Sequence, residues 1–291
     1  MHAKVFLSAG EASGDMYAAW LLEALRVRWP ELESFGCAGA RLRAAGCEPL
    51  LRSESLAMVG LAEVAGELPR VWRQYRRLIT DALARRPDLA VLVDSPDFNL
   101  RLARHLRRRG IAILYLVAPQ AWAWRPWRVR QLRRLVDRLL CIFPFEEAWF
   151  RERGVNAEYI GHPLTGRVSA QWTREEFFAR QRLDPRRPLL ALLPGSRRRE
   201  AALNLPVMLE AVARCDAQSL VAVPPELALP EVTLPVVRGA TYDALAHADL
   251  AVVASGTATI ETALLGTPMV VVYRVTQPSW WLGRLLVRTP F

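Results

Sequence analysis

Two short segments place groups that can bind an anion directly after a predicted strand. Residues 189–193 (LLALL) are uniformly apolar and predict a buried strand, and PGSRRRE at 194–200 then opens a helix. A helix start attracts phosphate because its first N–H groups are unpaired and lie at the positive end of the helix dipole. Gly195 lets backbone approach a ligand, Ser196 can donate a hydrogen bond, and Arg197 can bind phosphate through two parallel hydrogen bonds. The alternative interpretation is an ordinary strand-to-helix turn with solvated arginines.

The second segment, SGTATIE at 255–261, follows the strand that we predict at 250–254. A capping box at the helix start would explain its Ser/Thr–Glu spacing without any ligand, with Glu261 in the first turn. Two such turns in one half of the chain would instead present two donor-rich helix starts on one rim, which suits a diphosphate. Glu261 could also reach a ribose diol. The candidate nucleotide-binding residues of this segment are Ser255, Gly256, Thr257 and Glu261.

Carboxylates follow two predicted strands in the first half of the chain. DSPDFN at 94–99 comes directly after the strand predicted at 89–93, and Asp97 is our candidate general base for a hydroxyl. Glu11, in GEASGD at 10–15, competes for that role. Asp and Pro also form turns, so a plain turn is the alternative. The sequence has no Asp-x-Asp pair where a divalent metal would hold a diphosphate, so we expect arginine and helix starts to neutralise the charge, with no metal and no cofactor.

The histidines and cysteines do not predict a metal site. His162, in IGHPL at 160–164, is the one histidine that we place near the cleft, and a structural role is favoured for it. The cysteines include no CxxC pair, and three of the four lie among apolar or small residues typical of buried thiols. The four are Cys37, Cys47, Cys141 and Cys215.

The alternation of strands and helices predicts an α/β fold with two Rossmann-like domains that face each other across a cleft. Parallel sheets bind ligands at the carboxyl ends of their strands, so the loops of each sheet should cluster on one rim. We assign residues 1–165 to the first domain and 166–291 to a second, abbreviated one. The helical expectations are a helix at 16–29, a helical region at 55–86 interrupted at Pro69, and a basic helix at 125–138.

The composition indicates a folded protein with anionic partners. The 291 residues suffice for two domains, and 52% of them are hydrophobic. The net charge of +10 comes almost entirely from arginine, since Lys4 is the only lysine. Such a charge favours nucleic acid, phosphorylated small molecules or anionic lipid as partners. The N-terminal residues are not typical of a signal peptide, and the longest uncharged stretch, the fifteen residues 110–124, is too short to span a bilayer.

Three segments suggest contact with a membrane surface. The segment 122–134 has three tryptophans among five arginines, which suits either anionic headgroups or nucleic acid. A similar segment lies at 278–288, and the apolar segment 58–68 is either a buried helix or an exposed patch. We favour lipid over nucleic acid because no nucleic-acid-recognition fold is apparent. The candidate contacts are Met58, Val59, Leu61, Trp122, Trp124, Trp127, Trp280 and Trp281.

Together, the motifs resemble those of lipid-A-disaccharide synthases. The resemblance covers Val5–Phe291 and is carried, in this order, by GEASGD, DSPDFN, APQAWAW, FPFE, IGHPL, LLPGSR, SGTATIE and PMVVVYR. The family consists of inverting GT-B glycosyltransferases. The resemblance implies transfer of 2,3-diacylglucosamine from its UDP conjugate to 2,3-diacylglucosamine 1-phosphate (lipid X), which gives a β-1,6 disaccharide and UDP. It also implies a homodimer that is cytoplasmic and peripheral on the inner face of the Gram-negative inner membrane.

The resemblance also implies roles for single residues. Asp97 would be the base in the acceptor site, and Glu11 would lie at the cleft floor. Arg197, with Ser196, would bind the UDP diphosphate, and the segment 255–261 would hold the nucleotide. Members of the family usually continue beyond the end of this chain, with segments that contribute to the nucleotide site and exchange between subunits. The rival interpretations are another UDP-sugar GT-B enzyme, such as a MurG-like transferase or a UDP-sugar epimerase, and a catalytically impaired membrane-associated relative.

Overall fold

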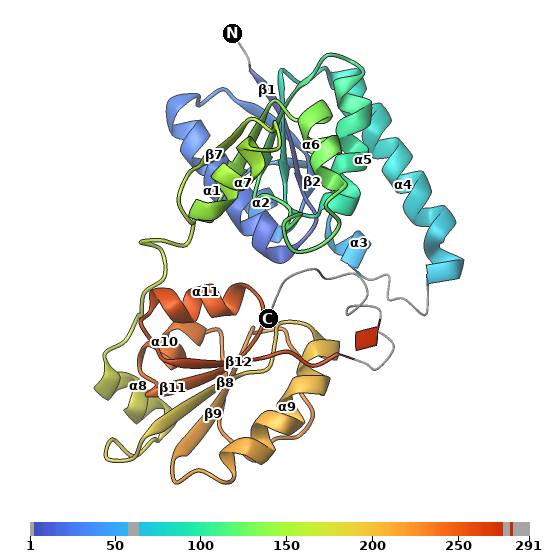
Figure 1. Cartoon of the computed structure of the whole chain (residues 1–291). Coiled ribbons are helices and arrows are strands. Elements are labelled where there is room, and N and C mark those ends of the chain that lie inside the picture. Colours follow the sequence, from blue (N-terminus) through green and yellow to red (C-terminus); the bar gives the residue numbers. More distant parts are fainter. Residues whose placement is uncertain (1–2, 58–63, 276–279, 282–291) are drawn as a thin grey trace. The chain divides into compact units, whose positions relative to one another are not determined.

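The computed structural model describes residues 3–57, 64–275 and 280–281. They form two compact units that divide between Pro163 and Leu164. Each unit is a sheet of parallel strands covered by helices (Figure 1). Residues 58–63 of the apolar segment 58–68 lie outside the described residues.

The N-terminal unit is built on a seven-stranded parallel sheet in the order β3-β2-β1-β4-β5-β6-β7. Continuous apolar runs such as LAVLV in β4 suit strands that are buried on both faces. The order reverses between β1 and β4: the chain adds two strands on one side of β1 and then crosses to build the rest beyond it. The strands are β1 (Lys4–Ala9), β2 (Glu33–Ala38), β3 (Glu48–Arg52), β4 (Leu89–Val93), β5 (Ala112–Leu116), β6 (Arg138–Cys141) and β7 (Ala157–Tyr159).

The described helices of this unit depart from the sequence expectations in three places. The helix after β1 begins at Ala12 and not at residue 16, so Gly14 lies buried in its first turn, next to Val93 of β4. Pro69 does not interrupt its helix, which continues through it as the sixth residue of Val64–Arg85. The basic helix spans only Arg128–Leu135. The helices are α1 (Ala12–Arg28), α2 (Ala40–Ala44), α3 (Glu54–Ala57), α4 (Val64–Arg85), α5 (Pro96–Arg107), α6 (Arg128–Leu135) and α7 (Pro144–Arg151).

The sheet of the N-terminal unit tolerates no side chain at one glycine of β2. Gly36 lies opposite Leu7 of β1 with φ +152°, and a Cβ built there would overlap the Leu7 carbonyl oxygen. We therefore expect Gly36→Ala to lower the free energy of unfolding of this unit by about 3 kcal/mol. Gly110→Ala is the matched control, because Gly110 has φ +75° but open space around it and should cost only about 1 kcal/mol. Urea unfolding measures both, and equal midpoints for the two variants would contradict the close approach.

The C-terminal unit repeats the same construction on a five-stranded parallel sheet in the order β10-β9-β8-β11-β12. The strands predicted at 189–193 and 250–254 are confirmed residue for residue as β8 and β11. The short strand β10 was not expected, because the Pro-rich sequence before it carries no alternating pattern. The elements are α8 (Arg174–Gln181), β8 (Leu189–Leu193), α9 (Arg198–Val212), β9 (Gln218–Val223), β10 (Val236–Arg238), α10 (Thr241–Ala246), β11 (Leu250–Ala254), α11 (Thr257–Leu264) and β12 (Met269–Val272).

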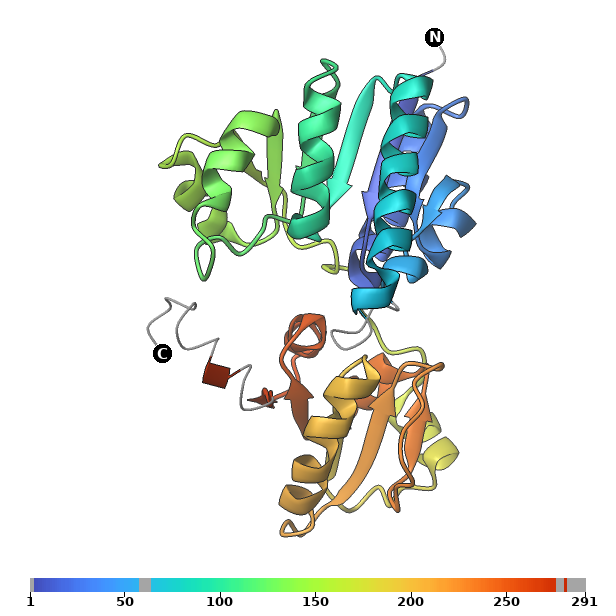
Figure 2. The same ribbon diagram turned by 90° about the vertical axis from the view of Figure 1, so that its right-hand side faces the viewer.

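Strand β8 is apolar at all five positions because helices cover both faces of its sheet. Alternate residues of a strand point to opposite faces of the sheet. Leu189, Ala191 and Leu193 pack with α8 and α10 on one face. Leu190 and Leu192 pack with α9 on the other face, and Figure 2 shows α9 lying along the sheet. Both faces are covered, so every position of β8 is apolar.

Each sheet has one point where the strand order reverses, and both points carry motifs found in the sequence. In the C-terminal unit the reversal lies between β8 and β11, and the chain leaves these strands into α9 and α11, which pack on opposite faces. In the N-terminal unit it lies between β1 and β4, which lead into α1 and α5. Loops that diverge at such a reversal leave a crevice at the carboxyl ends of the strands, which is where open α/β sheets bind ligands.

Candidate active site

The turn after β8 presents exposed donors at the start of α9. Gly195 has φ +121°, and an added Cβ there would lie 2.8 Å from the Glu200 side chain. Ser196 and Arg197 are exposed, and Arg197 is the N-cap residue of α9 but makes no side-chain capping bond. Its guanidinium lies 3.9 Å from the Glu200 carboxylate, and such an exposed pair at a long distance contributes little stability.

A buried asparagine holds this turn in place. Asn204, in α9, donates a side-chain hydrogen bond to the Pro194 carbonyl at 3.0 Å and accepts one from the Arg274 backbone N–H at 3.2 Å. It therefore ties the turn after β8 to the residues that follow β12. Its role could not be predicted from the sequence, because an asparagine within a helical pattern gives no signal of such contacts.

The turn after β11 has the expected residues but not the expected cap. Helix α11 begins at Thr257 with Gly256 as N-cap, so Glu261 lies beyond the first turn and no capping bond forms. The Thr259 hydroxyl instead donates to the Gly256 carbonyl at 2.8 Å. The capping-box interpretation is therefore wrong. The Glu261 carboxylate accepts a hydrogen bond from the Tyr242 hydroxyl at 3.1 Å, and Ser255 is fixed at the strand end by a 2.9 Å backbone bond to Val272.

The two turns at the reversal of the N-terminal sheet touch each other. An added Cβ on Gly10, after β1, would lie 2.7 Å from the Ser95 hydroxyl oxygen, after β4. Asp94 and Ser95 both have left-handed backbone, with φ +49° and +44°. Consecutive non-glycine residues in this region are strained and persist only where the surroundings hold them. The segment DSPDFN therefore needs neighbouring side chains to hold its backbone.

Two buried side chains hold that strained turn. Asn99 donates to the carbonyls of Val93 at 3.0 Å and Asp94 at 2.8 Å, and accepts from the Ser8 hydroxyl at 2.7 Å. The Tyr115 hydroxyl also donates to the Asp94 carbonyl, at 2.6 Å. Burial raises the pKa of Tyr115 well above its ordinary value, so it stays a neutral donor.

Asp97, in the first turn of α5, is engaged by two arginines. Both of its oxygens lie 2.8 Å from one Arg125 nitrogen, and Oδ1 lies 2.6 Å from Arg128. Partial burial raises the pKa of Asp97, but the hydrogen bonds and charges of Arg128 and Arg125 outweigh it, so the pKa lies below its ordinary value. The carboxylate is ionised at neutral pH, as a base must be, and its side chain remains 68% exposed.

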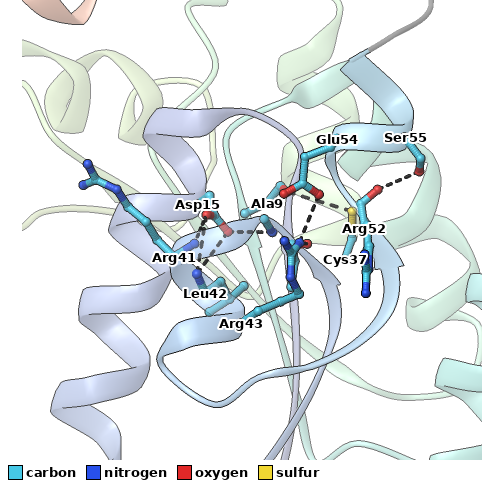
Figure 3. A network of polar contacts seen from close by, with 11 residues as sticks. Ala9, Asp15, Cys37, Arg41, Leu42, Arg43, Arg52, Glu54 and Ser55 are labelled. Atoms are coloured by element: carbon cyan, nitrogen blue, oxygen red, sulfur yellow. Dashed lines mark hydrogen bonds and ion pairs between the residues drawn. The ribbon is translucent and has the colours of Figure 1, made fainter. Parts of the chain in front are cut away.

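The two acidic residues of GEASGD have different environments. Glu11 is the exposed N-cap residue of α1 at the rim of the sheet. Asp15 is buried, and its carboxylate accepts backbone hydrogen bonds from Gly39 at 2.7 Å and Arg41 at 2.9 Å (Figure 3). Asp15 thereby caps α2, and only Glu11 of this pair faces solvent.

The remaining titratable candidates lie in structural settings. The His162 ring packs against Tyr17 and Phe143, with centroids 6.2 and 5.8 Å away, and partial burial lowers its pKa. Three cysteines are buried as predicted, and burial raises the pKa of each thiol to about 12. They are Cys37, Cys47 and Cys141, whereas Cys215 is exposed. Among the described residues, no group of histidine, cysteine and carboxylate side chains could hold a metal ion.

The tryptophans proposed for lipid contact differ in exposure. The Trp122 indole N–H donates to the buried Glu146 at 3.2 Å, and Trp124 lies beneath Arg125. Trp127 is 54% exposed and Trp281 is 61% exposed, with Trp280 packed edge to face against Trp281. Met58, Val59 and Leu61 lie outside the described residues. No described helix is both long and apolar enough to cross a bilayer.

Known proteins place this arrangement in a family. Residues 5–291 match the family model described as Lipid-A-disaccharide synthetase. The chain is 52% identical to the lipid-A-disaccharide synthase of Solibacter usitatus, over 99% of this chain and 78% of the relative. It is 44% identical to that of Koribacter versatilis, over 98% and 78%. The chain belongs to the lipid-A-disaccharide synthetase family.

A solved structure supports the fold of this family member. The chain superposes on a putative UDP-N-acetylglucosamine 2-epimerase from Listeria monocytogenes with a TM-score of 0.62, over 97% of this chain and 82% of the other. Their identity is 13%, so the likeness concerns the fold alone. The predicted α/β class, a GT-B fold with two Rossmann-like domains, is confirmed.

Proposed function

We propose that this member of the lipid-A-disaccharide synthetase family transfers 2,3-diacylglucosamine from its UDP conjugate to 2,3-diacylglucosamine 1-phosphate. The observation that carries the proposal is the reversal point between β8 and β11. There, two helix starts without side-chain caps meet an exposed arginine, Arg197. Such a site suits a diphosphate, which is the leaving group of a UDP-sugar.

On the donor side, the protein must stabilise the negative charge of the departing UDP. Breaking the bond between the anomeric carbon and the UDP oxygen leaves negative charge on the diphosphate. Arg197 and Ser196, with the N–H groups at the starts of α9 and α11, would bind that charge without a metal ion. Gly256 and Thr257 would contact the same phosphates, and Glu261, held by Tyr242, would bind the ribose hydroxyls.

On the acceptor side, a base is needed. Asp97 would take the proton of the acceptor 6-hydroxyl as the oxygen attacks the anomeric carbon from the face opposite UDP. The new C–O bond forms as the bond to UDP breaks, so the anomeric configuration inverts. Glu11 would orient the sugar, because it is exposed and follows β1, the strand next to β4 in the sheet.

Asn204 would set the geometry of the donor site. We expect Asn204→Ala to lower the free energy of unfolding by about 2 kcal/mol, because the Pro194 carbonyl loses its buried partner. UDP affinity should fall with it, since the turn that carries Ser196 and Arg197 loosens. Asn156→Ala is the control, because Asn156 is an exposed donor to the Asp137 carbonyl. Calorimetry with UDP and urea unfolding check both variants, and unchanged UDP affinity in Asn204→Ala would exclude the positioning role.

We also propose that the enzyme acts as a homodimer on the cytoplasmic, inner face of the inner membrane. Exposed Trp127 and Trp281, the 56% exposed Trp72 on α4, and the net charge of +10 support contact with anionic lipid. Flotation with vesicles containing anionic lipid and sedimentation equilibrium test the two proposals. A protein that stays off the vesicles, or that remains monomeric, would contradict the respective one.

A panel of substrates tests the proposed reaction against its rivals. We expect turnover with UDP-2,3-diacylglucosamine and the acylated acceptor phosphate, and none when either substrate lacks its acyl chains. Turnover of UDP-N-acetylglucosamine alone would indicate an epimerase instead. Transfer from unacylated UDP-N-acetylglucosamine to another lipid would indicate a different GT-B transferase.

A further inference from the structure

The partners of Asp97 form a cluster that the reaction described above does not use. Arg128, the first residue of α6, is 3% exposed, yet its guanidinium reaches the largely exposed Asp97. Arg125 reaches the same carboxylate from the loop before α6. Both guanidinium groups also lie over the Trp124 ring, with Cζ 4.3 Å from its centroid for Arg125 and 5.1 Å for Arg128.

The charges of this cluster do not balance. Two guanidinium groups share one carboxylate, and the first turn of α6 contains no acidic residue. The start of α6 adds the positive end of a helix dipole, where a cation such as Arg128 is unfavourable by itself. The surplus of positive charge lies beside the exposed Asp97 side chain, so a second anion can reach it from solvent.

The cluster is also held in shape before any ligand arrives. Arg125 has left-handed backbone with φ +55°, which costs energy in a residue other than glycine. The Trp124 ring supports both guanidinium planes, and burial fixes Arg128. Fixed guanidinium groups bind a tetrahedral oxyanion through parallel hydrogen bonds more strongly than flexible lysines do.

We propose that Arg125 and Arg128 bind the phosphate monoester of the acceptor sugar, and that Asp97 occupies this site until the acceptor arrives. The inference rests on the proposed function, in which Asp97 is the base and the acceptor is a sugar 1-phosphate. Binding exchanges one anion for another and breaks no covalent bond. The phosphate takes over the guanidinium groups, and the Asp97 carboxylate is released toward the acceptor hydroxyl.

This exchange couples acceptor recognition to base strength. A carboxylate freed from two guanidinium groups recovers a higher pKa and accepts a proton more readily. An acceptor without phosphate would leave Asp97 paired and therefore a weaker base. The arginine pair would thus select phosphorylated acceptors through kcat as well as through KM.

The test is calorimetric binding of glucosamine 1-phosphate, with glucosamine and inorganic phosphate as separate probes. We expect the 291-residue protein to bind glucosamine 1-phosphate, with inorganic phosphate weaker and glucosamine weakest. Saturating UDP should not compete, because UDP belongs to the other site. Arg125→Ala should weaken binding of the sugar phosphate about tenfold, and Arg125→Lys should restore only part of it. Arg134→Ala, an exposed charge deletion on the same helix, should leave binding unchanged.

The decisive variant is Asp97→Asn, which removes the competing anion. The exchange predicts that this variant binds glucosamine 1-phosphate about threefold or more tightly than the unaltered protein. A purely structural ion pair would give equal or weaker binding in Asp97→Asn, and that result would overturn the proposal. Displacement of the sugar phosphate by UDP, or equal binding by Arg125→Ala with native circular dichroism, would overturn it too. Because the assay needs no transfer, absence of turnover would count against the proposed function alone.

Discussion

Replacing Arg197 with alanine is expected to lower kcat/KM for the UDP-sugar by about a hundredfold or more. Arg197 is the exposed charged side chain at the N-cap of α9, next to Gly195 and Ser196, and its partner Glu200 is 3.9 Å away. The variant removes the group that would meet the charge on the departing diphosphate. Steady-state kinetics with varied donor measures the loss, and calorimetry with UDP separates binding from chemistry.

The control for this variant lies at the other end of the same helix. Arg214 is exposed, pairs with Glu210 at 2.8 Å and lies just beyond α9. Arg214→Ala makes the same change in net charge without touching the turn, and its kinetics should match those of the unaltered protein. Near-normal donor kcat/KM in Arg197→Ala, or an equal loss in Arg214→Ala, would exclude the diphosphate assignment.

Replacing Asp97 with asparagine is expected to lower kcat by about 10²–10⁴-fold while UDP affinity stays unchanged. The amide keeps the shape of the side chain but cannot accept the proton of the acceptor hydroxyl. The loss should appear in single-turnover rates with saturating donor and acceptor. Calorimetric titration with UDP confirms that the donor site is intact.

A surface carboxylate of the same unit provides the control for this prediction. Asp81→Asn, on α4, removes the half-buried partner of Arg77 and should leave turnover unchanged. Because the pKa of Asp97 lies below its ordinary value, protonation of Asp97 should not lower activity of the unaltered enzyme above about pH 5. Full turnover by Asp97→Asn would assign the base to another residue, with Glu11 the first to be examined.

The sequence predicts the sheets well because parallel strands covered on both faces leave an unmistakable pattern. Residues 189–193 and 250–254 are apolar at every position and match β8 and β11. Helix starts were less predictable, since Gly14 is typical of a loop but lies in the first turn of α1. Strand β10 was missed because it has only three residues. It is a strand only through its parallel pairing with β9, which the sequence does not show.

The candidate site was predictable in its exposed residues and not in the residues that hold them. Arg197, Ser196 and Asp97 were identified because their types and their place after a strand indicate chemistry. Asn204 and Asn99 were missed, because their importance depends on which carbonyls lie beside them in the folded chain. Both are buried in helices, and each donates a hydrogen bond to a backbone carbonyl in a turn of the candidate site.

The same limit applies to charge. The sequence shows Arg125 and Arg128 as members of a basic stretch that suggests lipid or nucleic acid. Only the fold brings them to Asp97, some thirty residues earlier in the chain. The carboxylate that we predicted as the general base is therefore the shared partner of two arginines.

The proposed reaction is tested most directly by the product that the 291-residue chain makes from UDP-2,3-diacylglucosamine and 2,3-diacylglucosamine 1-phosphate. Mass spectrometry and NMR of that product give its composition and its linkage, and a coupled assay counts the UDP released. We predict a tetra-acylated disaccharide 1-phosphate with a β-1,6 linkage and one UDP released for each disaccharide. An α-linked product, or UDP released without any disaccharide, would contradict inverting transfer between these two substrates.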